Sequence, residues 1–263
     1  MSGPLVSILI PHYQTESLAR LCLRSIRKYT ADVPHEVIVV DNASADGESL
    51  AYLRSVAWIR LIERPPEEVH PEGPWAHREA LDMAIRASRG PLVLSFHTDT
   101  IPLRPGWLGW LVGQIEADDR IAAVGTHKLE PPRPLKRLEA WVRKTFLPKA
   151  ASGERYREFI RSHCALYRRD VLEKLGLRFL TDAVVTTGRD IHVGLAEHGY
   201  EARLLAVREM MRWVSHLNHG TIALVADRGG SRKTRVRGAR RIERFLRRPE
   251  VRAVYEDESL DRA

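Results

Sequence analysis

The chain alternates between short apolar runs and longer segments in which apolar residues recur every three or four positions. Short apolar runs bounded by turn residues are typical of buried strands, and the longer periodicity is typical of helices that bury one face. Strands are predicted at 6–10, 36–40, 58–63, 92–96, 121–124, 162–167 and 202–207. Helices are predicted at 17–28, from 46–47 onward, and at 74–87, 138–146, 170–176, 191–198 and 237–247.

This strand–helix alternation predicts an α/β protein with a mostly parallel central sheet and helices on both faces. Polar segments follow three of the strands directly, at 11–14, 41–47 and 97–100. Because the carboxyl ends of parallel strands meet at one edge, where open α/β sheets bind their ligands, these segments are expected to lie together. The pattern predicts a site for a nucleotide-like ligand.

Composition narrows the class of protein without naming its activity. The 263 residues are 44% hydrophobic and 29% charged, which is ordinary for a globular protein. Residues 1–4 lead straight into the first strand with no signal-peptide pattern, and no apolar run approaches the length of a membrane span. Cys22 and Cys164 are far apart in sequence, and Cys22 is expected to be a buried free thiol. A reduced, cytoplasmic protein is the expectation.

The net charge of +8 favours anionic partners, and basic residues are densest between 228 and 252. The segment 229–248 predicts a basic amphipathic helix. It either docks on anionic lipid, making the protein peripheral at the inner face of the membrane, or packs on the core with its arginines in solvent. Nucleic acid is not an expected partner, because the sequence lacks a recognised binding motif or a basic platform with interleaved aromatics.

Several motifs then occur in a characteristic order: Ile8-Leu9-Ile10-Pro11-His12-Tyr13, Val39-Val40-Asp41-Asn42-Ala43-Ser44, Phe96-His97-Thr98-Asp99-Thr100 and Ala165 to Gly176. Together they resemble the inverting family 2 glycosyltransferases, which have the GT-A type of Rossmann-like fold. The resemblance covers about residues 5 to 220. It implies a GT-A catalytic domain at 1–228, divided into a nucleotide-sugar-binding half at 1–110 and an acceptor half at 111–228, followed by a basic helical tail at 229–263.

The resemblance also implies a nucleotide-sugar donor carrying UDP, GDP or dTDP, a divalent metal (Mn²⁺ or Mg²⁺), and a glycan, lipid-linked or small hydroxyl acceptor. Tyr13 and Asp41 match positions that hold the base and the ribose, although Asp41 could instead form a turn with Ser44. Arg78 falls near an arginine that faces the diphosphate, and the alternative is a solvated helix arginine. The full set implied for the donor is Pro11, Tyr13, Asp41, Asn42, Arg78, His97 and Thr98.

The metal site departs from the family pattern. His97 stands where the family's DxD motif has its first acid, while Asp99 keeps the second. One carboxylate can suffice when phosphates supply further oxygen ligands, so Asp99 is the expected ligand. His97 could add an imidazole ligand, bond the ribose or simply lie in the loop. His216 and His219 are further ligand candidates, with His216 favoured, or they are a pair of loop histidines.

The catalytic base is expected to be a carboxylate that takes the acceptor's proton. The family's usual Glu-Asp pair is absent, and Asp190 is the first candidate, with Asp182 second. Asp190 would equally suit the N-cap of the following helix. The predicted function is metal-assisted transfer of a sugar to a hydroxyl acceptor with inversion. The alternative is a degenerate GT-A module that binds a nucleotide sugar or glycan without turnover.

Overall fold

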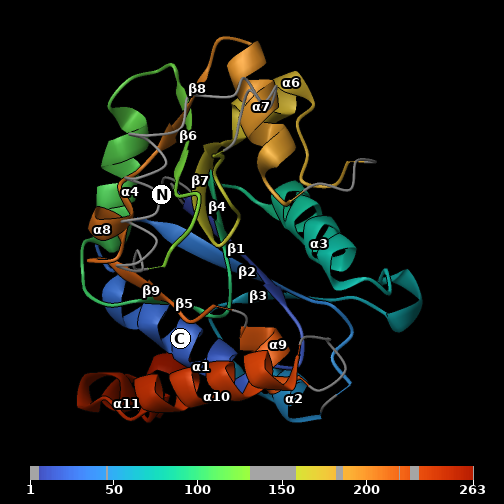
Figure 1. Ribbon diagram of the computed structural model, residues 1–263, viewed down its shortest axis with the longest axis vertical. Coiled ribbons are helices and arrows are strands. Elements are labelled where there is room, and N and C mark those ends of the chain that lie inside the picture. The colour runs from blue at the N-terminus through green and yellow to red at the C-terminus, as the bar shows by residue number, and fades with distance from the viewer. Residues whose placement is uncertain are drawn as a thin grey trace, which may run out of the picture.

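The computed structural model describes residues 6–45, 47–130, 158–181, 186–218, 220–225 and 231–262, and is built on a seven-stranded sheet (Figure 1). In spatial order the strands are β3 (Arg60–Glu63), β2 (His35–Asp41), β1 (Val6–His12), β4 (Leu92–Phe96), β7 (Cys164–Arg168), β6 (Ile121–Gly125) and β8 (Glu201–Leu204). The first four are parallel, β6 is parallel to β8, and β7 runs antiparallel to both of its neighbours. The expected mostly parallel α/β sheet is confirmed.

Helices cover both faces of the sheet, as expected. Their bounds are α1 (Glu16–Tyr29), α2 (Gly47–Ser55), α3 (Gly73–Ala87), α4 (Trp107–Glu116), α6 (Arg169–Leu175), α7 (Arg189–Glu197), α8 (Val207–Met210), α9 (Gly220–Leu224), α10 (Arg232–Leu246) and α11 (Pro249–Tyr255). Successive residues of a strand point to opposite faces. Ile8 and Ile10 of β1 therefore pack with α1 and α4, while Leu9 packs with α3 and α7. The two resulting cores hold the central strands rigidly from both sides.

A second, two-stranded sheet was not predicted. It pairs β5 (Thr100–Pro102) with β9 (Val214–His216) in antiparallel register, with Thr100 opposite His216. His216 therefore lies within a strand and is not the loop histidine of the alternative reading. Because the segment after β4 continues directly into β5, this pairing brings His216 beside Asp99.

Other boundaries differ from those predicted. The strand expected at 202–207 is β8, and it stops before Val207, where α8 begins. The basic helix expected at 237–247 begins earlier, at Arg232, because the Ser231 side chain caps it by accepting a hydrogen bond from the Thr234 N–H. The helix predicted at 138–146 lies outside the described residues. Within the described ranges, no helix is both long enough and apolar enough to cross a bilayer.

The C-terminal helices pack on the core of the sheet. Ile242 and Phe245 of α10, with Val251 and Val254 of α11, belong to the same apolar cluster as α1. The helices lie along α1 in Figure 1. This is the arrangement in which the tail packs on the core with its arginines in solvent. The boundary expected between residues 228 and 229 falls outside the described residues.

An ion pair ties the C-terminal turn to α1. Arg24 is 1% exposed, and its guanidinium Nε donates to both carboxylate oxygens of Asp261, at 3.0 and 3.1 Å. The Tyr52 hydroxyl of α2 donates to the same carboxylate at 3.0 Å. A buried charge needs such a partner, because leaving it unpaired costs several kcal/mol, on the order of 3–5. Asp261 therefore neutralises the buried charge of α1 and links the C-terminal turn to that helix.

Candidate functional site

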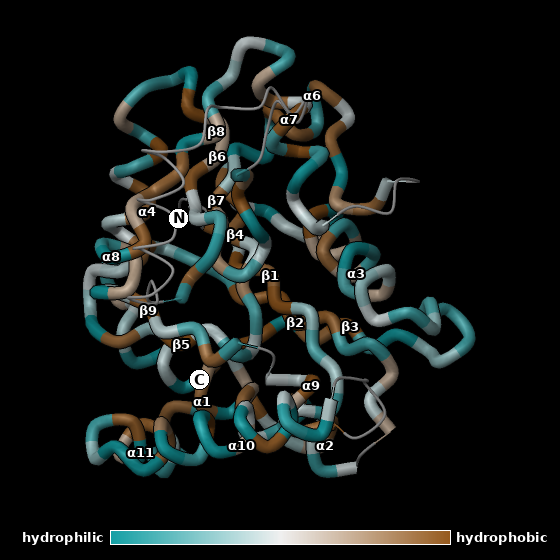
Figure 2. The backbone as a smooth tube through the Cα atoms, viewed as in Figure 1, coloured by the Kyte–Doolittle hydropathy of each residue, from teal (hydrophilic) through white to brown (hydrophobic). Residues whose placement is uncertain are grey.

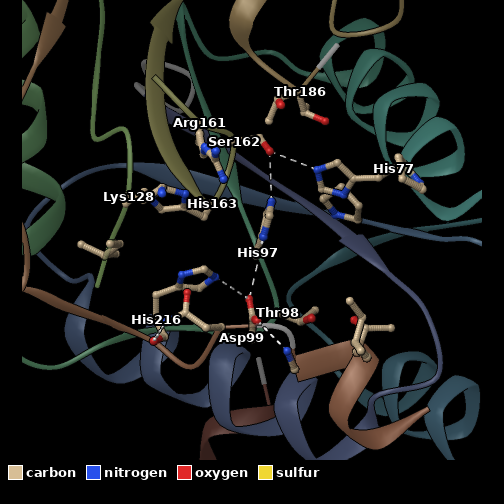
Figure 3. Close-up of a pocket in the computed structure, with 18 of the residues that line it drawn as sticks. His77, His97, Thr98, Asp99, Lys128, Arg161, Ser162, His163, Thr186 and His216 are labelled. Atoms are coloured by element: carbon tan, nitrogen blue, oxygen red, sulfur yellow. Dashed lines mark hydrogen bonds and ion pairs between the residues drawn. The ribbon is translucent and has the colours of Figure 1, made fainter. Parts of the chain in front are cut away.

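A cavity of about 490 Å³ opens at the carboxyl edge of the central strands (Figure 3). It is lined by the ends of β1 and β4, the start of α3, the segment before β7, and α9. The residues that carry its polar chemistry are His77, His97, Thr98, Asp99, Lys128, Glu130, Arg161, Ser162, His163, Thr186, Thr187, His216 and Thr221. Of the residues expected to contact the donor, Pro11, His97 and Thr98 line this cavity.

Asp99 is the anionic centre of the cavity. Its carboxylate lies 3.2 Å from Nε2 of His216 and accepts a hydrogen bond from the Gly220 N–H at 2.9 Å, while Nδ1 of His97 is 3.8 Å away. Burial alone would raise the pKa of Asp99, but His216 and the Gly220 N–H hold it well below its ordinary value. The group is therefore ionised, and negative charge is concentrated at one point of a mostly covered site.

Asp99, His97 and His216 could together hold a metal ion. One ligand atom from each lies within 4.8 Å of the other two. Two imidazoles and one carboxylate form a donor set that suits Mn²⁺ and other transition metals better than Mg²⁺, which prefers oxygen ligands. The residues present therefore fit a divalent transition-metal ion.

Further histidines surround this trio. The rings of His163 and His216 stack with centroids 5.0 Å apart, and His77 meets His97 edge-on at 4.7 Å. The Ser162 hydroxyl lies 3.2 Å from Nε2 of His77 and 3.1 Å from Nε2 of His97, and so bridges the two rings (Figure 3). This contact orients His97 so that its other nitrogen faces Asp99.

Burial keeps the imidazoles of His77, His97 and His163 neutral. It lowers the pKa of His97 to about 4, because Asp99 opposes the effect only in part and His216 adds to it. The pKa values of His77 and His163 fall well below the ordinary value, chiefly through burial, with neighbouring histidines contributing. Neutral imidazoles have a free lone pair, which is the form that binds metal.

Two cationic side chains occupy another wall of the cavity. Lys128 and Arg161 line it, and the guanidinium Nε of Arg161 is buried without a hydrogen-bond partner in the described part of the chain. Neither residue forms an ion pair within the described ranges. Because unpaired buried donors are costly, this wall is suited to an anionic ligand.

The sequence prediction missed His77, Lys128, Arg161, Ser162 and His163. The signal for the last two was present, since polar residues flank the apolar strand β7, but it lay at the wrong end for a parallel strand. β7 runs antiparallel to β4, so its amino end lies at the same edge as the carboxyl ends of the parallel strands. Sequence periodicity alone carries no strand direction.

Tyr13 and Asn42 lie in a separate hollow of about 270 Å³, together with Pro66, Val69, His70 and Pro71. One aromatic face and one amide in such a space match what a nucleobase requires. The Asn42 side-chain oxygen accepts from a guanidinium N–H of Arg64 at 2.8 Å, which fixes the orientation of the amide. Both residues were expected to contact the donor.

Asp41 is next to this hollow and adopts the turn that was its alternative reading. Its Oδ2 accepts from the Ser44 N–H at 2.9 Å and its Oδ1 from the Ser44 hydroxyl at 2.5 Å. Burial raises its pKa, and the Ser44 hydrogen bonds oppose that effect. Asp41 is 2% exposed, so its contact with a ribose stays a prediction.

Arg78 does not line the cavity. It is 2% exposed, which excludes the solvated helix arginine, and its guanidinium stacks on Trp75 with 4.4 Å to the ring centroid. Its Nε donates to the Pro74 carbonyl at 3.2 Å. A contact with a diphosphate stays a prediction for this residue.

Asp190, the expected base, is close in sequence to two residues of the cavity wall. Asp190 lies in the first turn of α7, and the N-cap is Gly188, so Asp190 is not the cap. Its carboxylate accepts a hydrogen bond from the Thr181 hydroxyl. Thr186 and Thr187 line the cavity, Asp190 does not, and Glu130 is a carboxylate that does. Asp182 and His219 lie outside the described residues.

The chain is similar in sequence to known bacterial proteins. Glucosyl-3-phosphoglycerate synthase of Mycolicibacterium paratuberculosis is 28% identical over 132 residues, which cover 49% of this chain and 39% of that protein. The O-antigen biosynthesis protein RfbC of Myxococcus xanthus is 25% identical over 222 residues, or 78% of this chain and 17% of RfbC. The chain thus spans well under half the length of these two relatives.

A solved structure shares the fold across nearly the whole chain. The mannosyltransferase PcManGT of Pyrobaculum calidifontis, in complex with GDP-Man and Mn²⁺, has a TM-score of 0.55 at 20% identity, covering 97% of this chain and 74% of that one. A family model described as glycosyl transferase family 2 matches residues 7–176, from β1 to the end of α6. The chain has the GT-A type of fold and belongs to glycosyl transferase family 2.

Proposed function

We propose that this protein transfers a sugar from a nucleoside-diphosphate sugar to a hydroxyl acceptor with inversion at the anomeric carbon. The observation that carries the proposal is the ionised Asp99, set between two imidazoles at the carboxyl edge of the sheet. Such a group holds a divalent cation, and a diphosphate leaving group requires one or an equivalent positive charge. Relatives named as a synthase of glucosyl-3-phosphoglycerate and a mannosyltransferase support the same chemistry.

Asp99 and His216 are the proposed metal ligands, with His97 as the third. A bound divalent ion would neutralise charge developing on the leaving diphosphate. The chain's own residues then do the remaining work. Ser162 holds the His97 ring in its orientation, and Gly220 donates to Asp99, so the ligands are positioned before the substrate arrives.

The donor's base is proposed to occupy the hollow lined by Tyr13 and Asn42. Asp41, next to this hollow, is proposed to contact the ribose. The donor would then extend from this hollow toward Asp99, because Pro11 of the cavity wall lies two residues before Tyr13 of the hollow. UDP, GDP and dTDP sugars all remain donors to be tested, since the hollow's aromatic face accepts any base.

Donor binding is tested by calorimetry with UDP, GDP, dTDP and their common sugars, in the presence and absence of Mn²⁺ or Mg²⁺. We expect one nucleotide class to bind in a metal-dependent way, with Mn²⁺ more effective than Mg²⁺. Binding of no nucleotide by a folded sample would contradict the proposal.

Asp190 is the proposed general base, and Glu130 is the competing carboxylate that the structure adds. Asp190→Asn should leave donor affinity nearly unchanged and reduce transfer by about 100-fold or more, because a general base acts only in the chemical step. The matched variants are Glu130→Gln and Asp182→Asn. If transfer survives Asp190→Asn and fails in one of the others, that other residue is the base.

A catalytically degenerate module is the second candidate function. The substitution of His97 for the first acid of the metal motif favours it, because the site then holds less negative charge for a cation. It predicts metal-dependent binding of a nucleotide sugar with neither transfer nor donor hydrolysis. Turnover of any donor would exclude it.

A further inference from the structure

Helix α10 carries a continuous stripe of positive charge. Lys233, Arg237, Arg240, Arg244 and Arg247 recur at intervals of four and three residues, so they lie above one another on one helix face. All five are exposed, whereas Gly238, Ile242 and Phe245 are buried against the core. Figure 2 shows α10 as a strongly hydrophilic helix at the edge of the molecule.

Most of this charge is not compensated by any acid among the residues that the structure describes. Glu243 is the single acid of α10, and it pairs with Arg247. Within the described ranges, Lys233, Arg237, Arg240 and Arg244 form no ion pair. Four exposed cations in a row raise the local potential and attract an extended anionic surface.

Apolar side chains are exposed on α10 and on the neighbouring helix α9. Three large apolar residues are notably exposed in the described part of the chain, and two of them are Val236 of α10 at 43% and Leu224 of α9 at 42%. The two helices pack closely, since a Cβ on Gly238 would lie 2.6 Å from the Cβ of Ala223. Cations with exposed aliphatic side chains among them suit the boundary between lipid headgroups and acyl chains.

This surface is connected rigidly to the cavity. Gly220, the first residue of α9, donates to the Asp99 carboxylate, and a Cβ on it would lie 2.8 Å from the Cβ of Asp99. Thr221 and Ile222 of α9 line the cavity. Any partner that binds α9 and α10 is therefore held at a fixed distance from Asp99.

We propose that the α9–α10 surface, defined by the five-residue stripe of α10 with Val236 and Leu224, docks on an anionic phospholipid bilayer. Charge complementarity selects the anionic headgroups, and the aliphatic side chains enter the interface. A single-stranded nucleic acid would use exposed aromatic side chains for stacking, but Phe245 of α10 is 5% exposed. Docking would hold the cavity beside acceptors carried in the bilayer, and only this consequence rests on the proposed function.

The test compares charge reversals at the stripe with reversals elsewhere. Sedimentation with phosphatidylcholine vesicles containing about a third phosphatidylglycerol should show binding that is absent with phosphatidylcholine alone and weakens as salt rises. Arg237→Glu, Arg240→Glu and Arg244→Glu together should weaken binding by about 100-fold or more. Truncation of the chain before α10 is unsuitable, because it would also remove Asp261, the partner of buried Arg24.

The matched control reverses Arg86, Arg208 and Arg212, which are also exposed, form no ion pair within the described ranges and lie outside α9 and α10. It makes the same change in net charge. If the control weakens vesicle binding as much as the stripe variant, binding reflects overall charge and the proposal is wrong. Absence of vesicle binding by the unaltered protein would also overturn it.

A second measurement separates insertion from contact with a soluble polyanion. Cys22 and Cys164 are 0% exposed, so in a Val236→Cys variant an environment-sensitive fluorophore attaches at position 236. Its emission should shift to the blue with phosphatidylglycerol vesicles and stay unchanged with single-stranded or duplex DNA. A label on Asp119→Cys, distant from α10, should not respond. A response to DNA and not to vesicles would assign the surface to nucleic acid.

Discussion

Two buried aspartates, both near the carboxyl ends of parallel strands, are held in opposite ways. Asp41 receives both of its hydrogen bonds from Ser44, three residues further along the chain. Asp99 receives its contacts from His216 and from Gly220, which is 121 residues away in sequence. The first carboxylate is satisfied by its own turn, and the second depends on the complete fold.

The difference indicates that the Asp41 turn has a structural role and the Asp99 cluster a chemical one. Local hydrogen bonds keep the Asp41 turn in shape whether or not a ligand is present. Asp99 is instead stabilised as an anion by His216 and the Gly220 N–H, and its trio with His97 and His216 lines the cavity. The Asp41 turn therefore shapes the hollow beside it, and the Asp99 cluster supplies the charge that a metal and a diphosphate need.

Replacing Asp99 should produce the largest effect. Asp99→Asn removes the only carboxylate of the trio, and transfer should fall by about 1,000-fold or more because the cation is no longer held at the leaving group. Calorimetric titration with Mn²⁺ should show binding lost. Asp41→Asn is the control and should retain Mn²⁺ binding; equal Mn²⁺ affinity in unaltered protein and Asp99→Asn would refute the metal assignment.

Acidification should destabilise the Asp99 cluster next most strongly. The folded protein keeps His77, His97 and His163 neutral with lowered pKa values, whereas the unfolded chain protonates them below about pH 6.5. The unfolded state then binds more protons, so stability falls as pH falls, by about 1 kcal/mol per histidine at about pH 5.5.

Urea unfolding of metal-free protein at about pH 7.5 and about pH 5.5 measures this loss. His163→Gln should reduce the difference between the two conditions by about a third, since one of three neutral imidazoles is removed. Equal stability at both pH values would show that the histidines are protonated in the folded protein.

Disruption of the Asp41 turn should have the smallest effect. Ser44→Ala removes the hydroxyl that donates to Asp41 and should destabilise the fold by about 1 kcal/mol. Nucleotide affinity should weaken a few-fold, with Mn²⁺ affinity unchanged. Ser55→Ala is matched, because its hydroxyl donates to the Tyr52 carbonyl at 2.7 Å, remote from the hollow; an equal loss of nucleotide affinity there would remove the special role of Ser44.

The same contrast explains what could be predicted from the sequence. The apolar runs of β1, β2 and β4 and the acids that follow them are local features, so the parallel sheet and the position of Asp99 were predicted. Ser44 lies within the motif that identified Asp41. Where three or four residues determine the structure, periodicity and motif are sufficient.

The remainder of the site depends on contacts that no local pattern encodes. His163 reaches the cavity because β7 is antiparallel, and His77 because α3 begins beside the end of β4. β5 and β9 are three residues each, too short for a period to show, yet their pairing places His216 against Asp99. The basic character of α10 was visible in the sequence, whereas its packing against α9 and α11 was not.

The Arg24–Asp261 ion pair has a consequence for the order in which the protein is made. The two residues are separated by 237 positions, so α1 leaves the ribosome long before the carboxylate that neutralises it. Until then Arg24 is a charge without its partner on a helix whose other face is apolar, and burial of that helix is opposed. The β1–α1–β2 unit can therefore assemble early in synthesis, but it reaches its final stability only when residue 261 has folded back onto it.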